Sequence, residues 1–210
     1  LEGQKCLVIG SGISGIGAVA LLEKYHADVV LYDSSDKLTK EDLEAKLPGE
    51  SKAVCIAGEL PEEVELSIQA AVLSPGVPTD IPLVNRMRDR GVQILGEIEL
   101  GFLAEQGRVI AITGTNGKTT TTTLTGEIMK AHFGAEKTFV VGNIGNPYTL
   151  EVTKTSKDSV TVGEISSFQL ETIHTFHPVV SAILNITPDH LNRHHTMEAY
   201  VAAKEAVASH

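Results

Sequence analysis

The sequence predicts an α/β protein in which helices cover parallel sheets. Short runs of β-branched and aliphatic residues alternate with amphipathic segments along the 210 residues. Two glycine-rich turns, at residues 10–15 and 114–117, each follow such a run and open a helix. Aromatic residues make up only 4% of the chain and Trp is absent, which suits helix-covered parallel strands better than an antiparallel sandwich.

Composition and charge exclude several function classes. The chain has 17 basic and 27 acidic residues and a formal net charge of -10, so it has no basic footprint for nucleic acid or an anionic membrane. No apolar run reaches the length of a membrane span, and the N-terminus enters a strand without a signal peptide. Cys6 and Cys55 lie in apolar runs, as buried thiols of a reducing compartment do. We therefore expect a cytoplasmic protein that holds anionic ligands locally.

The first unit is predicted over residues 1–92 as a Rossmann-like parallel sheet. Its glycine turn matches G-x-G-x-x-G, and Asp33 follows the second strand, where dinucleotide folds keep a ribose-binding acid. NAD or FAD binding therefore stays open. The unit has room for only one of the two mononucleotide-binding halves of a dinucleotide fold. This favours a nucleotide that is part of the substrate over a bound dinucleotide cofactor. The strands are expected at residues 5–10, 28–32, 53–57 and 70–74, and the helices at residues 11–22, at 37–47 and around 83–87.

The second unit is predicted over residues 93–210 and resembles a P-loop NTPase core. Alternating strand and helix signals again favour a parallel sheet. The strands are expected at residues 93–96, 109–113, 138–141, 159–165 and 179–186, and the helices at residues 97–103, after residue 117, around 148–152, from 166 and at 197–208.

The stretch after the strand at residues 109–113 is predicted to hold the phosphates of ATP. Glycines let the backbone turn its N–H groups toward an anion, and the start of the following helix favours negative charge. Lys118 is expected to reach the terminal phosphates, and Thr119 to offer a hydroxyl to Mg²⁺. The loop is tighter than the usual pattern, because Ile112 stands where a further glycine is common. The predicted ATP-binding residues are Gly114, Thr115, Asn116, Gly117, Lys118, Thr119 and Thr120.

Polar residues follow the predicted strands of the second unit. Asn143, Glu164 and the pair Asp189-His190 each come at a strand's carboxyl end, as the phosphate loop does. Since these ends lie along one edge of a parallel sheet, the four loops should converge on one crevice. Glu164 alone is more often a salt-bridged strand end, but beside the phosphate loop it supplies the acid that Mg²⁺ requires.

Lys204 falls on the apolar stripe of the last predicted helix, together with Tyr200 and Val207. A snorkelling surface lysine and a functional buried one explain this pattern about equally well. In the buried case desolvation lowers the pKa and exposes a neutral amine. Such an amine can take up CO₂ as a carbamate, which offers an oxygen ligand to a second metal ion.

These motifs together resemble the Mur ligases of bacterial peptidoglycan and cell-wall synthesis. The resemblance spans nearly the whole chain and rests on residues 114–119, Gly142-Asn-Ile-Gly145, Glu164 before two serines, Asp189-His190 and Lys204, in this order. The segment Glu164-Ile-Ser-Ser-Phe-Gln-Leu-Glu171 is similar to that of the member that adds D-glutamate. The resemblance implies an ATP-dependent ligase that joins D-glutamate to UDP-N-acetylmuramoyl-L-alanine through an acyl phosphate.

The resemblance also implies roles for individual residues. The implied catalytic residues are Lys118, Glu164, His190 and Lys204. Two Mg²⁺ ions are implied, one held by Thr119 and Glu164 and the other by His190 and carbamylated Lys204. The residues implied to bind the UDP-muramoyl substrate are Ser14, Asp33, Ser34, Ser74, Asn143 and Ser166.

Two departures from the family pattern limit these expectations. Asn192 stands where the family commonly has Asp in its D-H-x-D-R segment. The family enzymes are also longer, with a larger central domain and a third domain. We therefore expect an N-terminal fragment with an incomplete central domain and little activity alone, from an enzyme that is monomeric in full-length form.

Three alternatives remain at this point. A two-domain NAD(P)-binding oxidoreductase or sensor built on residues 10–15 leaves the phosphate loop and Glu164 unexplained. A P-loop ATPase or kinase with another substrate leaves the first unit unexplained. A non-catalytic binding module is the third alternative.

Overall fold

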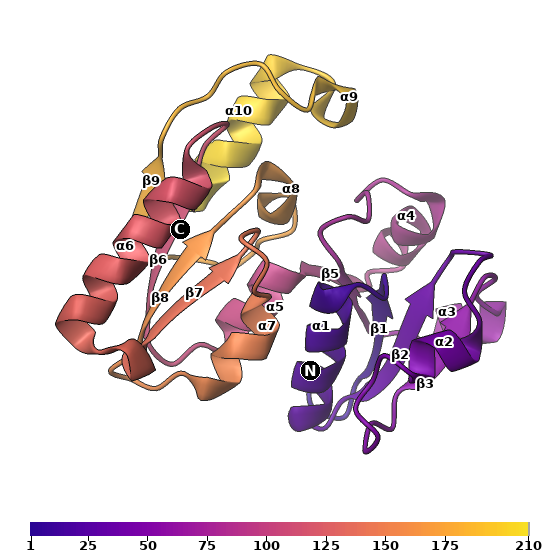
Figure 1. The fold of residues 1–210 in the computed structure, drawn as a ribbon. Helices are drawn as coiled ribbons and strands as arrows, with labels where there is room; N and C mark the ends of the chain where they lie inside the picture. Colours follow the sequence, from indigo (N-terminus) through magenta and orange to yellow (C-terminus); the bar gives the residue numbers. More distant parts are fainter. Residues whose placement is uncertain (210) are drawn as a thin grey trace.

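The computed structural model describes residues 1–209 and contains two parallel sheets (Figure 1). The strand orders are β3-β2-β1-β4-β5 and β7-β8-β6-β9. The first order is the doubly wound one expected of a Rossmann-like sheet. The predicted α/β class is confirmed. Among the described residues, no helix has both the length and the apolar character needed to cross a membrane.

The first sheet forms because its short aliphatic strands bury both faces between helices. Thr39 and Asp42 form a capping box that starts one surface helix, and Pro82 occupies the first position of another. The strands are β1 (Lys5–Ile9), β2 (Asp28–Asp33), β3 (Val54–Ala57), β4 (Ala70–Leu73) and β5 (Gln93–Gly96). The helices are α1 (Ile13–Lys24), α2 (Lys40–Glu44), α3 (Glu62–Ser67) and α4 (Pro82–Asp89).

Strand β5 belongs to the first sheet. It pairs in parallel with β4, with Ile94 opposite Ala71. The boundary predicted at residue 92 separates β5 from the strand with which it pairs, so the first sheet extends past that boundary to Gly96. Helix α5 (Glu97–Ala104) follows β5 directly, and Gly96 is both the last residue of the strand and the N-cap of the helix.

Helix α3 has no counterpart among the predicted elements. Its buried Glu65 accepts hydrogen bonds from Arg86 and Arg90 at the end of α4, with the closest distances from guanidinium nitrogen to carboxylate oxygen at 2.6 and 3.0 Å. These ion pairs, together with Val64 and Leu60 packed on the sheet, fix the short helix. A tertiary contact of this kind leaves no periodic signal over six residues.

In the second sheet, β6 lies between β8 and β9, so the phosphate loop leaves an interior strand. The strands are β6 (Arg108–Thr113), β7 (Thr138–Gly142), β8 (Val160–Glu164) and β9 (Val180–Ile183). The helices are α5, α6 (Lys118–Phe133), α7 (Tyr148–Glu151), α8 (Ser167–Leu170), α9 (Leu191–His194) and α10 (Met197–Glu205). Short 3₁₀ turns cover Ala135–Lys137, Val152–Lys154 and Ala206–Ala208.

Three helices, α1, α5 and α7, pack together between the two sheets (Figure 1). The close approach requires glycine, because a Cβ added to Gly17 lies 2.5 Å from Thr149 Oγ1 and one added to Gly101 lies 2.7 Å from the Tyr148 ring. One apolar cluster runs from Val8 in the first sheet through these helices to Ala111 in the second. The two sheets therefore share a continuous core.

Two buried acids on α5 accept hydrogen bonds from segments that connect strands of the second sheet. Glu99 is 1% exposed and accepts four hydrogen bonds, from the backbone N–H groups of His174, Thr175 and Phe176 and from the Thr175 hydroxyl. Glu97 accepts from the N–H and hydroxyl of Thr149 on α7. Burial raises the pKa of Glu97.

We predict that Glu99→Ala lowers the free energy of unfolding by about 3 kcal/mol, because it removes four hydrogen bonds to a buried carboxylate and leaves the N–H of the buried Phe176 unpaired. Urea denaturation followed by circular dichroism measures the change. Glu198→Ala, at an exposed acid in α10, is the control and should change stability by less than about 0.5 kcal/mol. Equal losses in the two variants would show that Glu99 is not an anchor.

Candidate functional site

The phosphate loop lies between β6 and α6. Gly114 and Gly117 have φ values of 150° and 83°, which side chains rarely allow. A Cβ on Gly114 would also lie 3.1 Å from Leu184. Ile112 is buried within β6, and the strand continues to Thr113, the residue before Gly114. The turn between strand and helix is therefore short. The loop is therefore fixed by backbone geometry, with the first N–H groups of α6 directed to one point.

Residues from the end of β9 brace this loop. Asn185 accepts from the Asn116 N–H at 2.9 Å and donates to the Asn116 carbonyl at 3.0 Å, and its own carbonyl accepts from the Thr115 N–H. The Thr115 hydroxyl accepts from the Thr187 N–H and lies 3.0 Å from the Tyr200 hydroxyl. Sequence analysis missed Asn185, although its place after β9, the neighbour of β6, is the signal that could have identified it.

Lys118 and Lys204 meet at the loop. Both ammonium groups donate to the Gly114 carbonyl at 2.9 Å, and Lys118 also donates to the Thr115 carbonyl at 3.0 Å. Lys204 is only 1% exposed, which decides for the buried alternative over the snorkelling one. Burial, helped by the charge of Lys118 and opposed by Asp189, lowers the pKa of Lys204 from 10.5 to about 8.

Glu164 and Asn143 meet at the ends of β8 and β7. The Asn143 amide donates to Glu164 Oε1 at 3.0 Å, while Glu164 Oε2 is buried and has no hydrogen-bond partner among the described residues. Glu164 pairs in register with Ile112 of β6, so its carboxylate sits on the strand next to the phosphate loop. A buried carboxylate oxygen without a partner is suited to a cation.

Thr119 and Thr120 are exposed in the first turn of α6. His190, the half-exposed N-cap of α9, has a left-handed backbone with φ at 52°. Its ring lies 5.0 Å from the Phe168 ring and 6.5 Å from the Tyr200 ring. Tyr200 thus lies between His190 and the buried Lys204, whose ammonium is 4.8 Å from the Tyr200 ring.

Ser166 caps a helix. Its hydroxyl accepts from the Gln169 N–H and donates to Gln169 Oε1, and the Ser166 N–H donates to the same oxygen. This capping box explains why the helix starts at Ser167. A substrate can contact the Ser166 hydroxyl only alongside or in place of these bonds.

In the first domain, Asp33 holds the glycine loop. Its Oδ2 accepts from the N–H and hydroxyl of Ser11 at 2.9 and 2.6 Å, and Oδ1 accepts from Ser35. Burial raises the pKa of Asp33, but these hydrogen bonds outweigh it, so the pKa is lowered overall. Lys46 donates to the Ser11 hydroxyl at 2.8 Å. Ser11 and Lys46 were missed because one precedes the helix and the other lies outside any motif.

A pocket of about 460 Å³ opens beside Asp33. Ser34 lines the pocket. At the edge of the pocket, the Ser74 hydroxyl donates to the Gly10 carbonyl at 3.1 Å. Ser14 is half-buried in the first turn of α1. The sequence-predicted residues of the first domain thus surround the carboxyl edge of its sheet, where open α/β sheets bind ligands. The lining comprises Ile9, Gly10, Tyr32, Asp33, Ser34, Gly76, Val77, Pro78, Ile81, Pro82 and Leu83.

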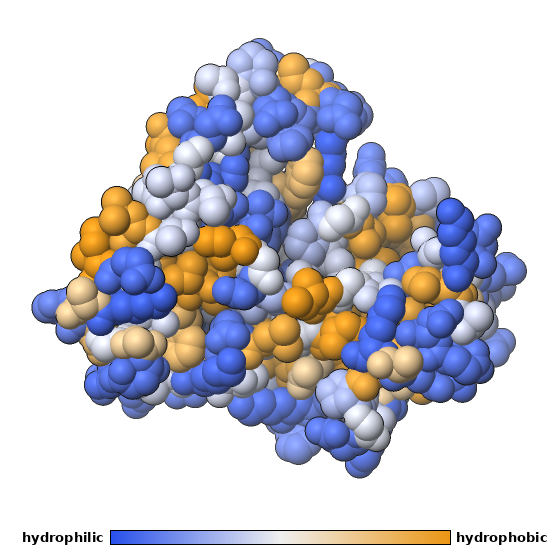
Figure 2. All heavy atoms as spheres, in the orientation of Figure 1, coloured by the Kyte–Doolittle hydropathy of each residue, from blue (hydrophilic) through white to orange (hydrophobic). Residues whose placement is uncertain are grey.

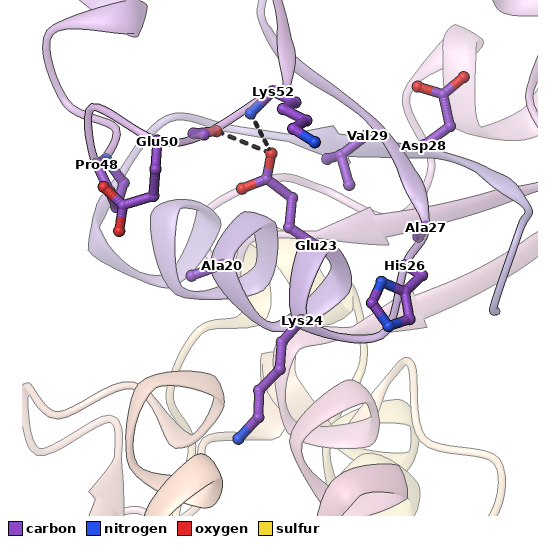
Figure 3. A pocket seen from close by; sticks show the side chains of 11 residues that line it. Ala20, Glu23, Lys24, His26, Ala27, Asp28, Val29, Pro48, Glu50 and Lys52 are labelled. Carbon is purple, nitrogen blue, oxygen red and sulfur yellow. Dashed lines mark hydrogen bonds between the residues drawn. The ribbon is translucent and has the colours of Figure 1, made fainter.

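The surface is hollowed between the part that carries α9 and α10 and the part that carries α4 (Figure 2). Helix α4 follows the carboxyl end of β4, and α9 and α10 follow the carboxyl end of β9. The pocket residues and the phosphate loop therefore lie at the edges of their sheets where ligands bind in α/β proteins. A different pocket of about 500 Å³ includes the start of β2, at the opposite edge of the first sheet (Figure 3). There Glu23 is engaged by the Ser51 hydroxyl and the Lys52 N–H.

Comparison with known proteins gives family matches on both domains. Residues 4–96 match the Mur ligase MurD-like N-terminal domain, and residues 112–210 match the Mur ligase middle domain. A curated protein of Lachnospira eligens named UDP-N-acetylmuramoylalanine–D-glutamate ligase is 58% identical over 99% of this chain and 46% of its own length. A protein of the same name from Lachnoclostridium phytofermentans is 55% identical over 96% of this chain and 44% of its own.

The chain spans about half the length of these curated relatives. Among solved structures, it is similar in fold to the UDP-N-acetylmuramate:L-alanyl-gamma-D-glutamyl-meso-diaminopimelate ligase of Neisseria meningitides. The TM-score is 0.60 at 15% sequence identity, with 97% of this chain and 67% of that chain covered. The two family matches together take in nearly every residue, in the domain order found here. The chain belongs to the Mur ligase family.

Proposed function

We propose that this chain provides the nucleotide-substrate and ATP-phosphate sites of a ligase that adds D-glutamate to UDP-N-acetylmuramoyl-L-alanine. The observation that carries the proposal is the meeting of Lys118 and Lys204 on the Gly114 carbonyl, directly after the strand that pairs with the strand of Glu164. A phosphate loop of this kind suits transfer of a phosphoryl group, and the names of the relatives support the substrates.

The proposed reaction has two steps. The substrate carboxylate attacks the γ-phosphorus of ATP, the bond to the bridging oxygen breaks, and ADP leaves. The amine of D-glutamate then attacks the acyl phosphate carbon, phosphate departs, and the ammonium loses a proton to leave an amide. Both steps need negative charge to be held in place, and preorganised donors do this without reorganisation.

The residues of the loop divide these tasks. Lys118 and the N–H groups that begin α6 hold the ATP phosphates, and Asn185 keeps the loop in the required conformation. His190, whose ring lies 6.5 Å from the Tyr200 ring, is proposed to lie near the acyl phosphate. Asn143 already donates to Glu164 and has a second N–H for the muramoyl substrate.

The residues present fit a magnesium ion at Glu164. The unpartnered Oε2 of this buried side chain is a hard oxygen ligand, and Thr119 offers a hydroxyl from the first turn of α6. When bound, Mg²⁺ would neutralise charge on the phosphates. A second ion is proposed at His190 and carbamylated Lys204. The described residues contain no group of three or more His, Cys, Asp or Glu side chains that could hold a metal ion, so oxygens of substrate or water would complete either set.

The first-domain pocket is proposed to take the UDP end of the substrate. Asp33 accepts from Ser11 and Ser35 with both its oxygens, so it organises the glycine loop before any ribose arrives. The pocket and the glycine loop also carry Ser14, Ser34 and Ser74, which we propose contact the UDP end of the substrate. The oxidoreductase alternative gains no support from a Mur ligase match on this domain.

We predict that the chain binds UDP-N-acetylmuramoyl-L-alanine and UDP, and that it gives no heat with NAD. Isothermal titration calorimetry measures this. Lys118→Ala should weaken Mg-ATP binding at least about tenfold, because a charged hydrogen-bond donor to phosphate is lost, and should leave UDP binding unchanged. Lys130→Ala, at a lysine paired with Glu127 on the same helix, is the matched control. NAD binding without UDP binding would overturn the proposed function.

We predict that Lys204 forms a carbamate with ¹³C-labelled CO₂, detected by carbon NMR. Carbamate formation needs the neutral amine. With a pKa of about 8, roughly one Lys204 in ten is neutral at pH 7, compared with fewer than about one in a thousand for an ordinary lysine. At constant dissolved CO₂ the signal should therefore rise from pH 6.5 to 8.5.

Lys204→Gln should abolish the signal and Lys130→Ala should retain it. A signal that survives Lys204→Gln, or none from the wild type at pH 8.5, would contradict this assignment.

A further inference from the structure

Glu171 follows α8 and connects the two domains. Its Oε2 accepts from Arg193 Nη2 at 3.0 Å and from the Thr79 hydroxyl at 3.2 Å. Thr79 belongs to the first domain, whereas Glu171 and Arg193 belong to the second. The side chains of Glu171 and Arg193 are each only 18% exposed, so solvent screens this ion pair less than it would a surface pair.

On the side of the second domain, Glu171 fixes the turn that follows His190. Arg193 lies over the Phe168 ring, with its guanidinium carbon 4.0 Å from the ring centre. His194 is buried, places Nδ1 3.4 Å from Glu171 Oε1, and places Nε2 2.9 Å from the Ser167 hydroxyl. Both Arg193 and His194 lie in α9, which has His190 as its N-cap. The position of His190 therefore depends on the contacts of Glu171.

On the side of the first domain, Thr79 lies in the loop between β4 and α4. Its neighbours Val77 and Pro78 line the pocket beside Asp33. The Thr79 carbonyl accepts from Arg88 Nη2 at 3.1 Å, so α4 holds the backbone of the loop while Glu171 holds its side chain. The Thr79–Glu171 hydrogen bond therefore joins the loop beside this pocket to the residue that contacts α9.

We propose that Glu171 is a positioning residue that sets the distance between the first-domain pocket and the His190 turn. This inference rests on the proposed function, in which one ligand places its nucleotide in the pocket and its carboxylate near His190. A ligand that spans both domains then depends on the Thr79–Glu171 contact. A ligand held by one domain alone does not.

The test compares Thr79→Val, which keeps the shape of the side chain but removes its hydroxyl, with Thr79→Ser, which keeps the hydroxyl. Calorimetry with UDP-N-acetylmuramoyl-L-alanine, UDP and Mg-ADP should show about a fivefold loss for Thr79→Val with the first ligand only. Thr79→Ser should restore wild-type affinity. Equal losses for UDP and for the muramoyl nucleotide, or no loss with either, would overturn the inference.

A second measurement needs no ligand. Thermal unfolding of the wild type, Thr79→Val, Glu171→Ala and the double variant forms a double-mutant cycle, in which the losses should fall short of additive because both changes remove the same contact. Additive losses would show that the two domains are not joined there. If the wild type bound no UDP ligand while the cycle showed coupling, the proposed function would fail and the interdomain contact would stand.

Discussion

The arrangement of the site depends on the packing of α5 between the two sheets. Strand β5 runs into this helix without a loop, and the buried carboxylates of Glu97 and Glu99 bind α7 and residues 174–176. The Ile94 carbonyl, in β5 itself, lies 2.7 Å from His174 Nε2. Burying a carboxylate without hydrogen-bond donors costs free energy. Each carboxylate therefore favours the one orientation of α5 in which its donors are within hydrogen-bond distance. The carboxyl edges of the two sheets, which carry the pocket and the phosphate loop, are thereby held in a fixed relation.

Within that frame, the site concentrates positive charge in a chain whose formal net charge is -10. Lys118 and Lys204 share one carbonyl oxygen, and no carboxylate oxygen of the described residues forms an ion pair with either of them. Two cations held this close repel each other, which is part of the reason why the pKa of Lys204 falls. An incoming polyphosphate relieves the repulsion, and so does conversion of Lys204 to an anionic carbamate. The geometry therefore favours anion binding through local charge rather than through net charge.

Sequence reasoning recovered the features that local physics determines. The phosphate loop, the parallel strands and the place of Lys204 on an apolar helix stripe follow from glycine spacing, β-branched runs and helical periodicity, whereas the burial of Lys204 was decided only by the structure. It missed what depends on tertiary contacts. Helix α3 is fixed by Glu65 with Arg86 and Arg90, and the pairing of β5 is decided by a neighbour about twenty residues earlier in the chain. Asn185 likewise acts on a loop far away in the sequence. Composition and period do not change around α3 and β5, so a single sequence offers no signal for these contacts, and for Asn185 the only signal is its place at the end of a strand.

Apolar packing and directional hydrogen bonds both hold the two domains in place. Apolar packing of α1, α5 and α7 is continuous and non-directional, so it resists separation of the sheets but specifies small rotations weakly. The hydrogen bond from Thr79 to Glu171 crosses the domain boundary, whereas those to Glu97 and Glu99 join α5, which continues β5, to the rest of the second domain. Each of these bonds is directional and is lost within about an ångström of displacement. A substrate that must bring its carboxylate to ATP tolerates little misplacement, since effective concentration falls steeply with distance. The buried acids at the domain boundary therefore supply the precision that the apolar core alone does not.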